Sequence, residues 1–304
     1  MVRPAAISAD NSDMIVFDRD LIALRRARAK TVFLNHDFLF RWSKEQLGER
    51  LLDINRDFPS VLQIGSRGSF ARGEHSKLNQ NIVTCDLCPS PIEGSTSHYI
   101  QGDEEFLPIA PKTMDLVVSN LNLHSTNDLP GALLQIRKTL KDDGMFLASM
   151  LGGETLYELR ETMAATEQEL LAEQSPRVFP FADKPQIGGL LARAGLALPV
   201  VDSDIITVTY ENVFKLMADL RGMGESNSIF KRSKKPLTKD FFMRLAQNYQ
   251  ERYGDKDGRI KASFEVIFLL GWAPDKSQQK PLPPGSAKMT LAEALDTEEI
   301  KLGE

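Results

Sequence analysis

The stretch LQIGSRGSFARGEH, residues 62–75, joins the end of an apolar run to a short loop that contains Gly65 and Gly68. The residues SVLQIG predict a buried strand that stops at Gly65. A glycine turn between a strand and a helix lets the backbone approach a ligand closely, and the helix N-terminus favours negative charge. The stretch therefore predicts the βα turn of a nucleotide-like cofactor site, although two glycines in a loop also serve simply to make a turn.

A second predicted strand, NIVTCD, supports the cofactor interpretation. It ends on Asp86, which follows Gly65 by about 20 residues, the interval at which an acidic residue accepts hydrogen bonds from ribose hydroxyls. Further strand and helix patterns alternate along the chain. In order, they predict a helix over 38–55, the two strands already described, a strand over 113–121, a helix over 131–144 that ends at Gly144, and a strand over 145–151. This alternation predicts a parallel, doubly wound α/β sheet.

The pattern changes after residue 151. Residues 155–173 predict one long polar helix, and strand-like runs cover 198–209 and 263–272, with helical and loop signals between them. The second run contains aromatic and β-branched residues and could close the sheet. We expect an N-terminal segment (1–37), a cofactor-binding core (38–152), a helical insertion with the closing strands of the same domain (153–273), and a Pro-rich and acidic tail (274–304).

The composition is that of an ordinary soluble globular protein. Of the 304 residues, 42% are hydrophobic and 26% are charged, and no apolar run approaches the roughly 18 residues of a membrane-spanning helix. The net charge of -5 argues against nucleic acid as a partner. The N-terminus lacks a secretion signal, so we expect a cytoplasmic protein in a bacterium, with peripheral contact to the inner membrane, or a matrix protein in a mitochondrion.

The C-x-x-C pair Cys85 and Cys88 invites a zinc or redox interpretation. Zinc would need two further ligands, and the sequence has neither a second cysteine pair nor a close histidine pair. A redox dithiol normally opens a helix, whereas this pair follows a predicted strand. We therefore predict no metal site and two structural cysteines.

The block GDEEFLPIAPKTMDLVVSNLNLH places the acidic pair Asp103 and Glu104 before a strand led by Asp115. This block resembles class I S-adenosylmethionine-dependent methyltransferases, in which an acidic residue at the Asp103 position lies beside the adenine. The alternative for the pair is a solvated turn. The resemblance implies a Rossmann-like seven-stranded sheet that binds S-adenosylmethionine through Gln63, Gly65, Gly68, Asp86, Asp103, Glu104 and Asn120.

Four further segments narrow the resemblance: IVFDRDL (15–21), GGETLYELR (152–160), DLRGMGESN (219–227) and FEVIFLLGW (264–272). Together they are similar to the methyltransferase-fold assembly factors of respiratory complex I, which are also similar to bacterial malonyl-acyl carrier protein O-methyltransferases. The resemblance runs from about residue 14 to about residue 290. It implies hydroxylation of an arginine on a subunit of the quinone-binding module, a protein client. The alternatives are methyl transfer to an acyl-carrier thioester and a client-binding factor without catalysis.

The glycine loop departs from the methyltransferase pattern. An acidic residue is typical at the Gln63 position, and glycines are typical where Arg67 and Ser69 stand. Gln63 cannot neutralise the cofactor's amino group, and Arg67 has the same charge sign as the sulfonium. We expect binding to weaken by about 1 to 3 kcal/mol, or one to two decades, unless Arg67 points to solvent.

Four residues are candidates for the chemistry on the substrate side: His124, Tyr157, Glu225 and Asn227. His124 follows the strand that begins at Asp115, near the expected reactive end of the cofactor, although packing explains it equally well. Glu225 and Asn227 would face a substrate, or Glu225 would cap a turn. Tyr157 and Arg160 share a helix face and would line the entrance or pack the helix. The basic run Lys231, Arg232, Lys234 and Lys235 would contact an acidic partner or form a solvated loop.

Overall fold

The computed structural model describes residues 15–70, 75–91, 98–172, 174–279, 285–286 and 289–297. Residues 71–74, which belong to the stretch LQIGSRGSFARGEH, lie outside the described residues. The chain divides into two units, Met1–Pro274 and Asp275–Glu304. The second unit contains one short described helix, α8 (Leu291–Ala294). Within the described residues no helix has both the length and the apolar character needed to cross a bilayer.

The first unit is built on a seven-stranded sheet in the order β3-β2-β1-β4-β5-β7-β6. The strands are β1 (Phe58–Ile64), β2 (Leu78–Asp86), β3 (His98–Gln101), β4 (Met114–Ser119), β5 (Leu140–Leu151), β6 (Ala197–Tyr210) and β7 (Ile260–Trp272). The first five strands pair in parallel, and β7 runs antiparallel between β5 and β6. This arrangement confirms the predicted methyltransferase-like α/β fold, including the closure of the sheet by the last predicted strand.

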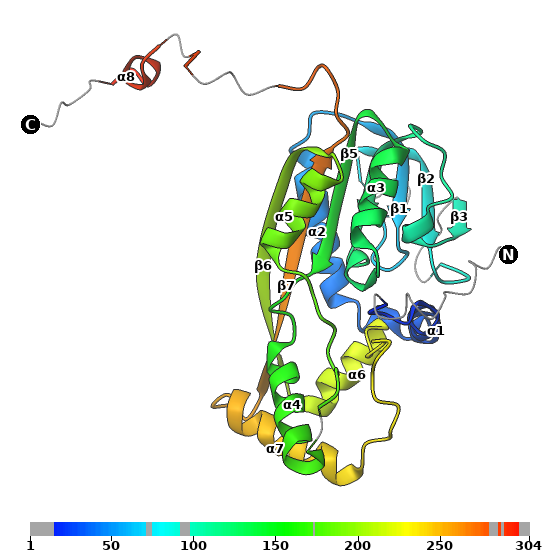
Figure 1. The fold of residues 1–304 in the computed structure, drawn as a ribbon, viewed down its shortest axis with the longest axis vertical. Helices are drawn as coiled ribbons and strands as arrows, with labels where there is room; N and C mark the ends of the chain where they lie inside the picture. Colours follow the sequence, from blue (N-terminus) through cyan, green and yellow to red (C-terminus); the bar gives the residue numbers. More distant parts are fainter. Residues whose placement is uncertain are drawn as a thin grey trace, which may run out of the picture. The chain divides into compact units, whose positions relative to one another are not determined.

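Helices cover both faces of the sheet (Figure 1). On one face α2 (Phe38–Leu52) buries Leu47 and Leu51. On the other face lie α3 (Leu129–Thr139) and α5 (Lys184–Arg193), which form a separate core cluster with β1, β4 and β5. The sheet therefore has the two apolar cores that a parallel α/β sheet requires.

The remaining helices of the first unit gather at the end of the sheet where β5 ends (Figure 1). They are α1 (Arg19–Ala29), α4 (Tyr157–Leu171), α6 (Val213–Met223) and α7 (Lys239–Tyr253), with the 3₁₀ turns η2 (Phe33–Asn35), η3 (Glu104–Phe106) and η4 (Leu123–Ser125). Helix α1 packs against α6, and α4 packs against α7. The chain before α1 is tied to the segment after α6 by an antiparallel bridge between Phe17 and Ile229. Thus α1 and the GMGESN segment form one continuous cover over the ends of the strands.

The predicted boundary between the helix over 131–144 and the strand over 145–151 is wrong. The helix predicted to end at Gly144 ends at Thr139, and the strand predicted to begin at residue 145 begins at Leu140. Leu140 continues the helical spacing of the apolar residues, but its backbone is extended and its side chain fills the core beside β4. The short strand β3 was not predicted, because its four residues are only half-buried or exposed and carry no apolar run.

Candidate functional site

The glycine loop closes on the chain itself. Gly65 has φ +87°, and a Cβ at this position would lie 2.8 Å from the Asn122 side chain, so the backbone can approach Asn122 only without a side chain. The Gln63 side chain bonds within the loop: its amide donates to the Phe70 carbonyl (2.9 Å) and accepts from the Phe70 N–H (2.6 Å). This pair of bonds folds the loop back onto the end of β1.

Asp86, at the carboxyl end of β2, is buried and fully engaged. Its Oδ2 accepts hydrogen bonds from the Ser66 N–H (2.6 Å) and hydroxyl (2.7 Å), and its Oδ1 accepts from the Cys88 N–H (2.9 Å). Burial alone would raise the pKa of this carboxyl group, but the Arg26 charge and the hydrogen bonds from Cys88 and Ser66 together lower it. Asp86 therefore stays ionised at the position where a ribose is expected.

The acidic pair after β3 is held by one arginine from α1. Arg19 lies 2.8 Å from Asp103 Oδ1 and 2.7 Å from Glu104 Oε1, and it also donates to the Ser125 carbonyl. Its charged neighbours outweigh the effect of burial and raise the pKa of Arg19. The pair is thus part of an ion network in which Glu104 is buried and Asp103 is partly exposed, and not a solvated turn.

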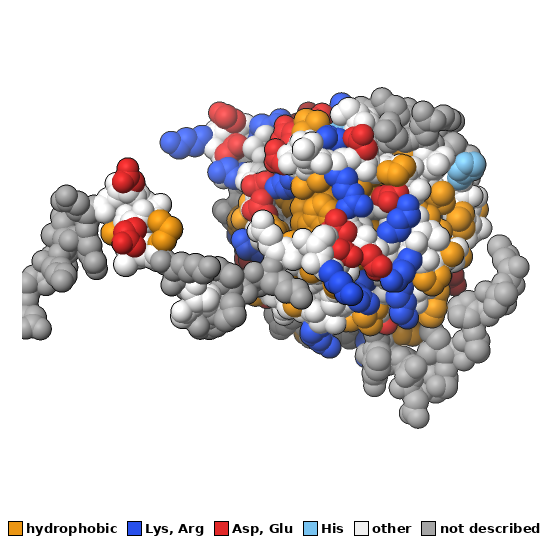
Figure 2. Space-filling view, turned by 90° about the horizontal axis from the view of Figure 1, so that it is seen from above, with side chains coloured by type: hydrophobic (Ala, Val, Ile, Leu, Met, Phe, Trp, Pro, Cys, Tyr) orange, Lys and Arg blue, Asp and Glu red, His pale blue; other side chains and the backbone are white. Residues whose placement is uncertain are grey.

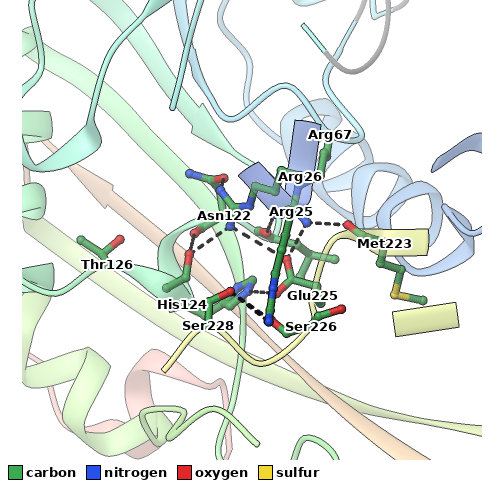
Figure 3. A network of polar contacts seen from close by, with 12 residues as sticks. Arg25, Arg26, Arg67, Asn122, His124, Thr126, Met223, Glu225, Ser226 and Ser228 are labelled. Carbon is green, nitrogen blue, oxygen red and sulfur yellow. Dashed lines mark hydrogen bonds and ion pairs between the residues drawn. The ribbon is translucent and has the colours of Figure 1, made fainter. Parts of the chain in front are cut away.

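A second ion network joins the glycine loop to the GMGESN segment (Figure 3). Arg67 is buried, with one Nη 2.5 Å from Glu225 Oε1 and 2.9 Å from the Met223 carbonyl. His124 Nε2 lies 3.1 Å from Glu225 Oε2. Arg67 therefore does not point to solvent: its charge is neutralised within the chain, by a residue 158 positions away.

The helix end beside this network explains why Glu225 points inward. Helix α6 ends at Gly224, whose backbone is left-handed, and the N–H groups of Gly224 and Glu225 bond back to the carbonyls of the last turn. Desolvation would raise the pKa of the Glu225 carboxyl group, but Arg67, His124 and Arg26 hold it well below its usual range. The GMGESN segment (222–227) thus places an ionised carboxylate beside the glycine loop.

Arg26, from α1, lies at the junction of these networks. It donates to Asn122 Oδ1 (2.7 Å) and Ser125 Oγ (2.9 Å), and its Nη2 is 3.9 Å from Glu225 Oε1. The residue is 1% exposed. Burial and the like charge of Arg67 lower the pKa of Arg26. Its nearest carboxylate is already in contact with Arg67.

An apolar cavity of about 240 Å³ lies beside the Glu225 network. Its walls come mainly from α2, α4, α6 and the loop before α5, and the polar groups on its wall include Glu225 and Arg221. Most lining side chains are apolar: Leu39, Phe40, Leu121, Leu151, Leu156, Leu159, Met163, Val178, Phe179, Phe181, Met217, Leu220, Met223, Leu237, Phe242 and Phe264. This cavity can take an aliphatic or aromatic side chain beside a carboxylate.

The other predicted site residues, Asn120, Asn227 and Tyr157, lie in three different places. Asn120 bridges the Phe40 and Gly68 carbonyls, so it fixes the loop. Asn227 lines the cavity and donates to the Pro176 carbonyl. Tyr157 lies outside the cluster, where its ring meets Tyr253 edge-on.

The basic run and Arg160 lie away from this cluster as well. Arg160 bonds to the carbonyls of Gly153 and Thr155 at the start of its own helix. In the basic run Lys231, Lys234 and Lys235 are exposed, whereas Arg232 binds Asp18. Basic and acidic side chains are intermingled on the face shown in Figure 2.

Cys85 and Cys88 are buried free thiols. Desolvation, with nearby carboxylates, raises the pKa of each thiol to about 12. Among the described residues, no group of three or more His, Cys, Asp and Glu side chains has an arrangement that could hold a metal ion.

Sequence reasoning missed Arg19 and Arg26, which hold the acidic residues and the ends of the strands. Arg19 lies within IVFDRDL, so the resemblance of that segment was a usable signal. Nothing in the run of arginines over 25–28 distinguishes the buried Arg26 from the exposed Arg28. Their role became visible only from the packing of α1 across the sheet.

Three buried polar atoms in the described chain have no hydrogen-bond partner: Arg19 Nε, Arg26 Nε and His124 Nδ1. All three belong to this cluster, and buried polar atoms are normally paired. The cluster also contains ionised Asp86, the Asp103 and Glu104 pair, and the backbone of the glycine loop. These groups fit a polar, charged adenosyl ligand. They lie at the carboxyl end of β1, between β2 and β4, which is the switch point at which open α/β sheets bind ligands.

Comparison with known proteins agrees with this geometry. Residues 62–148 match the methyltransferase domain family. The chain is 36% identical to arginine-hydroxylase NDUFAF5 of Danio rerio over 92% of this chain and 89% of that protein. It is 35% identical to the malonyl-[acyl-carrier protein] O-methyltransferase of Xylella fastidiosa over 76% and 78%.

One solved structure illustrates the shared fold. The YcgJ protein of Bacillus subtilis superposes with a TM-score of 0.51 at 15% identity, covering 76% of this chain and 99% of that one. The long matches at more than a third identity carry the assignment further than fold. The chain belongs to the NDUFAF5 arginine-hydroxylase family.

Proposed function

We propose that this protein binds S-adenosylmethionine at the carboxyl end of its sheet and acts on an arginine of a protein client during assembly of respiratory complex I, on a subunit of the quinone-binding module. The observation that carries the proposal is the match to an arginine hydroxylase at 36% identity over 92% of the chain. The closed networks around Asp86 and Glu225 are the local support.

The residues around β1 and β2 would hold the cofactor. Asp86 would accept hydrogen bonds from the ribose hydroxyls. Asp103 and Glu104 would lie beside the adenine, and the Gly65 backbone would contact the ligand. When bound, the cofactor supplies a sulfonium centre and its methyl group. Because Ser66 and Arg19 now engage these carboxylates, binding requires that they exchange or share their hydrogen bonds.

The apolar cavity would receive the client side chain. An arginine has an aliphatic stem that packs against leucine and phenylalanine side chains, and a planar guanidinium that prefers a carboxylate. Glu225 is a carboxylate on the cavity wall, and because Arg67 and Arg26 already contact it, a client guanidinium would have to share it with them. His124, a titratable side chain, lies within hydrogen-bond distance of the Glu225 carboxylate.

The test is a deletion strain of the source organism, with complex I activity and the mass of the client arginine as readouts. We expect complex I activity to fall and the client to lose a mass increment of one oxygen atom. The native gene and Asp142→Asn, an exposed control, should restore both, and Glu225→Gln should not. Normal complex I in the deletion strain would refute the proposed function.

Two other functions give different results in the same strain. A methylene increment in place of oxygen would indicate methyl transfer. A biotin requirement with normal complex I would indicate the acyl-carrier O-methyltransferase, for which the exposed lysines of the basic run offer contacts to an acidic carrier. Full rescue by Asp86→Ala would indicate a client-binding factor that needs no cofactor.

The family also bears on location. The NDUFAF5 relatives are mitochondrial by name. We infer the mitochondrial matrix for a eukaryotic source, and the cytoplasm with contact at the inner membrane for a bacterial one. The client is a protein in both settings.

A further inference from the structure

Within the described residues, Arg26 makes no hydrogen bond to a carboxylate. Glu225 contacts Arg67 at 2.5 Å and Arg26 at 3.9 Å, so one carboxylate serves two buried guanidinium groups. The two hydrogen bonds of Arg26 go to neutral acceptors, Asn122 and Ser125. Its Nε has no acceptor, although the residue is 1% exposed. A buried cation is normally paired, so this arrangement calls for an anion.

The position of Arg26 indicates where such an anion would bind. Its acceptors Asn122 and Ser125 lie just after β4, and Asn122 packs against Gly65 at the end of β1. Figure 3 shows the Arg26 side chain reaching into this region from α1, beside Asn122. β1 lies between β2 and β4, which makes this edge the switch point of the sheet.

We propose that Arg26 binds the α-carboxylate of the adenosyl amino-acid cofactor. The inference rests on the proposed function, because it assigns a residue to that same cofactor. Guanidinium groups bind carboxylates through paired N–H donors, and two of the five N–H groups of Arg26 are shown to be used.

The charges around Arg26 favour a zwitterion with one carboxylate over a phosphate. Asp86 and Glu104 are close enough to affect the pKa of Arg26, and Glu225 contacts its guanidinium. A multiply charged phosphate would be repelled by these three carboxylates. A cofactor with a carboxylate and a cationic amino group offers one charge to Arg26 and the opposite charge to its acidic neighbours.

The proposal also explains why α1 covers the site. Asp18 caps the N-terminus of α1, and the Asp18 backbone N–H donates to the Ser228 carbonyl. Gly224, at the end of α6, approaches the Arg26 backbone closely. A Cβ on Gly224 would lie 3.1 Å from Arg26 Cα. The GMGESN segment and α1 thus place Arg26 and Glu225 together.

The experiment is a calorimetric titration with two compounds, S-adenosylhomocysteine and the same compound without its α-carboxyl group. The native protein should bind the carboxylated compound about tenfold more tightly or better, as expected for charge-assisted hydrogen bonds. Arg26→Gln should bind the two compounds with nearly equal affinity. Arg28→Gln, an exposed arginine of the same helix, should keep the native preference.

The outcomes separate this assignment from the proposed function. Equal affinity of the native protein for both compounds, or an unchanged preference in Arg26→Gln, would overturn the assignment and leave the cofactor site intact. If the native protein bound neither compound, the cofactor part of the proposed function would fail with it. Should Arg26→Gln not fold, Arg26→Lys, which keeps the charge but loses the paired donors, is titrated in its place. It should show a smaller preference than the native protein, and an unchanged preference would overturn the assignment.

Discussion

Replacing Glu225 by Gln should destabilise the folded protein by about 3 to 5 kcal/mol, the usual cost of breaking a buried ion pair from one side. The carboxylate is 2.5 Å from Arg67, 3.1 Å from His124 and 3.9 Å from Arg26, and all four side chains are buried. Gln is nearly isosteric, so the loss comes from charge and not from a cavity. Arg67 and Arg26 would then repel each other without compensation.

A double-mutant cycle measures the interaction energy between Arg67 and Glu225. Arg67→Met removes one of the two cations that Glu225 serves, so Glu225→Gln should cost less in that background. We expect the double variant to be more stable than the sum of the single variants predicts, by about 1 to 3 kcal/mol. Urea unfolding followed by circular dichroism measures all four proteins.

A matched control is Asp142→Asn, which removes one carboxylate of an exposed pair with Lys112. It should leave the unfolding midpoint close to the native value. Additivity of the two buried substitutions within about 0.5 kcal/mol would contradict the coupling between Arg67 and Glu225.

Three further predictions concern single residues. Burial lowers the pKa of His124, so as the pH falls the unfolded chain binds a proton before the folded chain does. The free energy of unfolding should therefore decrease below pH ~6.5, by up to about 1.4 kcal/mol per pH unit. Urea titrations across pH measure this slope, and His124→Gln should flatten it. Cys85 and Cys88, with pKa values raised to about 12, should resist a thiol reagent at pH 8 until the protein unfolds, and rapid reaction of the folded protein would contradict their burial. Gly65→Ala should lower stability by about 1 to 3 kcal/mol because φ is +87° and a Cβ would meet a side chain at 2.8 Å, whereas Gly189→Ala, in open space on a helix, should be neutral or stabilising; a thermal melt in which both behaved alike would refute this.

Much of the fold could be predicted from local patterns. Buried parallel strands are short apolar runs, and SVLQIG, NIVTCD and MFLASML are such runs, so the strand positions could be found. The end of α3 could not, because Leu140 occupies a helical position in the sequence and an extended one in the chain. Tertiary packing beside β4 decides between them.

The site was predictable only in part, since its networks join distant segments. Asp86 ends a strand that the sequence reveals, whereas Asp103 follows β3, which was not predicted. The partner of Arg67 lies 158 residues away, and the partner of Asp103 lies 84 residues earlier. Spacing rules describe neighbours on one helix or strand, so they cannot pair Arg67 with Glu225 or place Arg26 above the sheet.

The most direct test of the central claim is a calorimetric titration of the purified protein with S-adenosylmethionine, repeated on Asp86→Ala. We predict saturable binding to the native protein and its loss in Asp86→Ala, with Asp142→Asn binding like the native protein. Absence of saturable binding at millimolar cofactor, or equal binding by Asp86→Ala, would contradict the assignment of a working cofactor site to the end of β2.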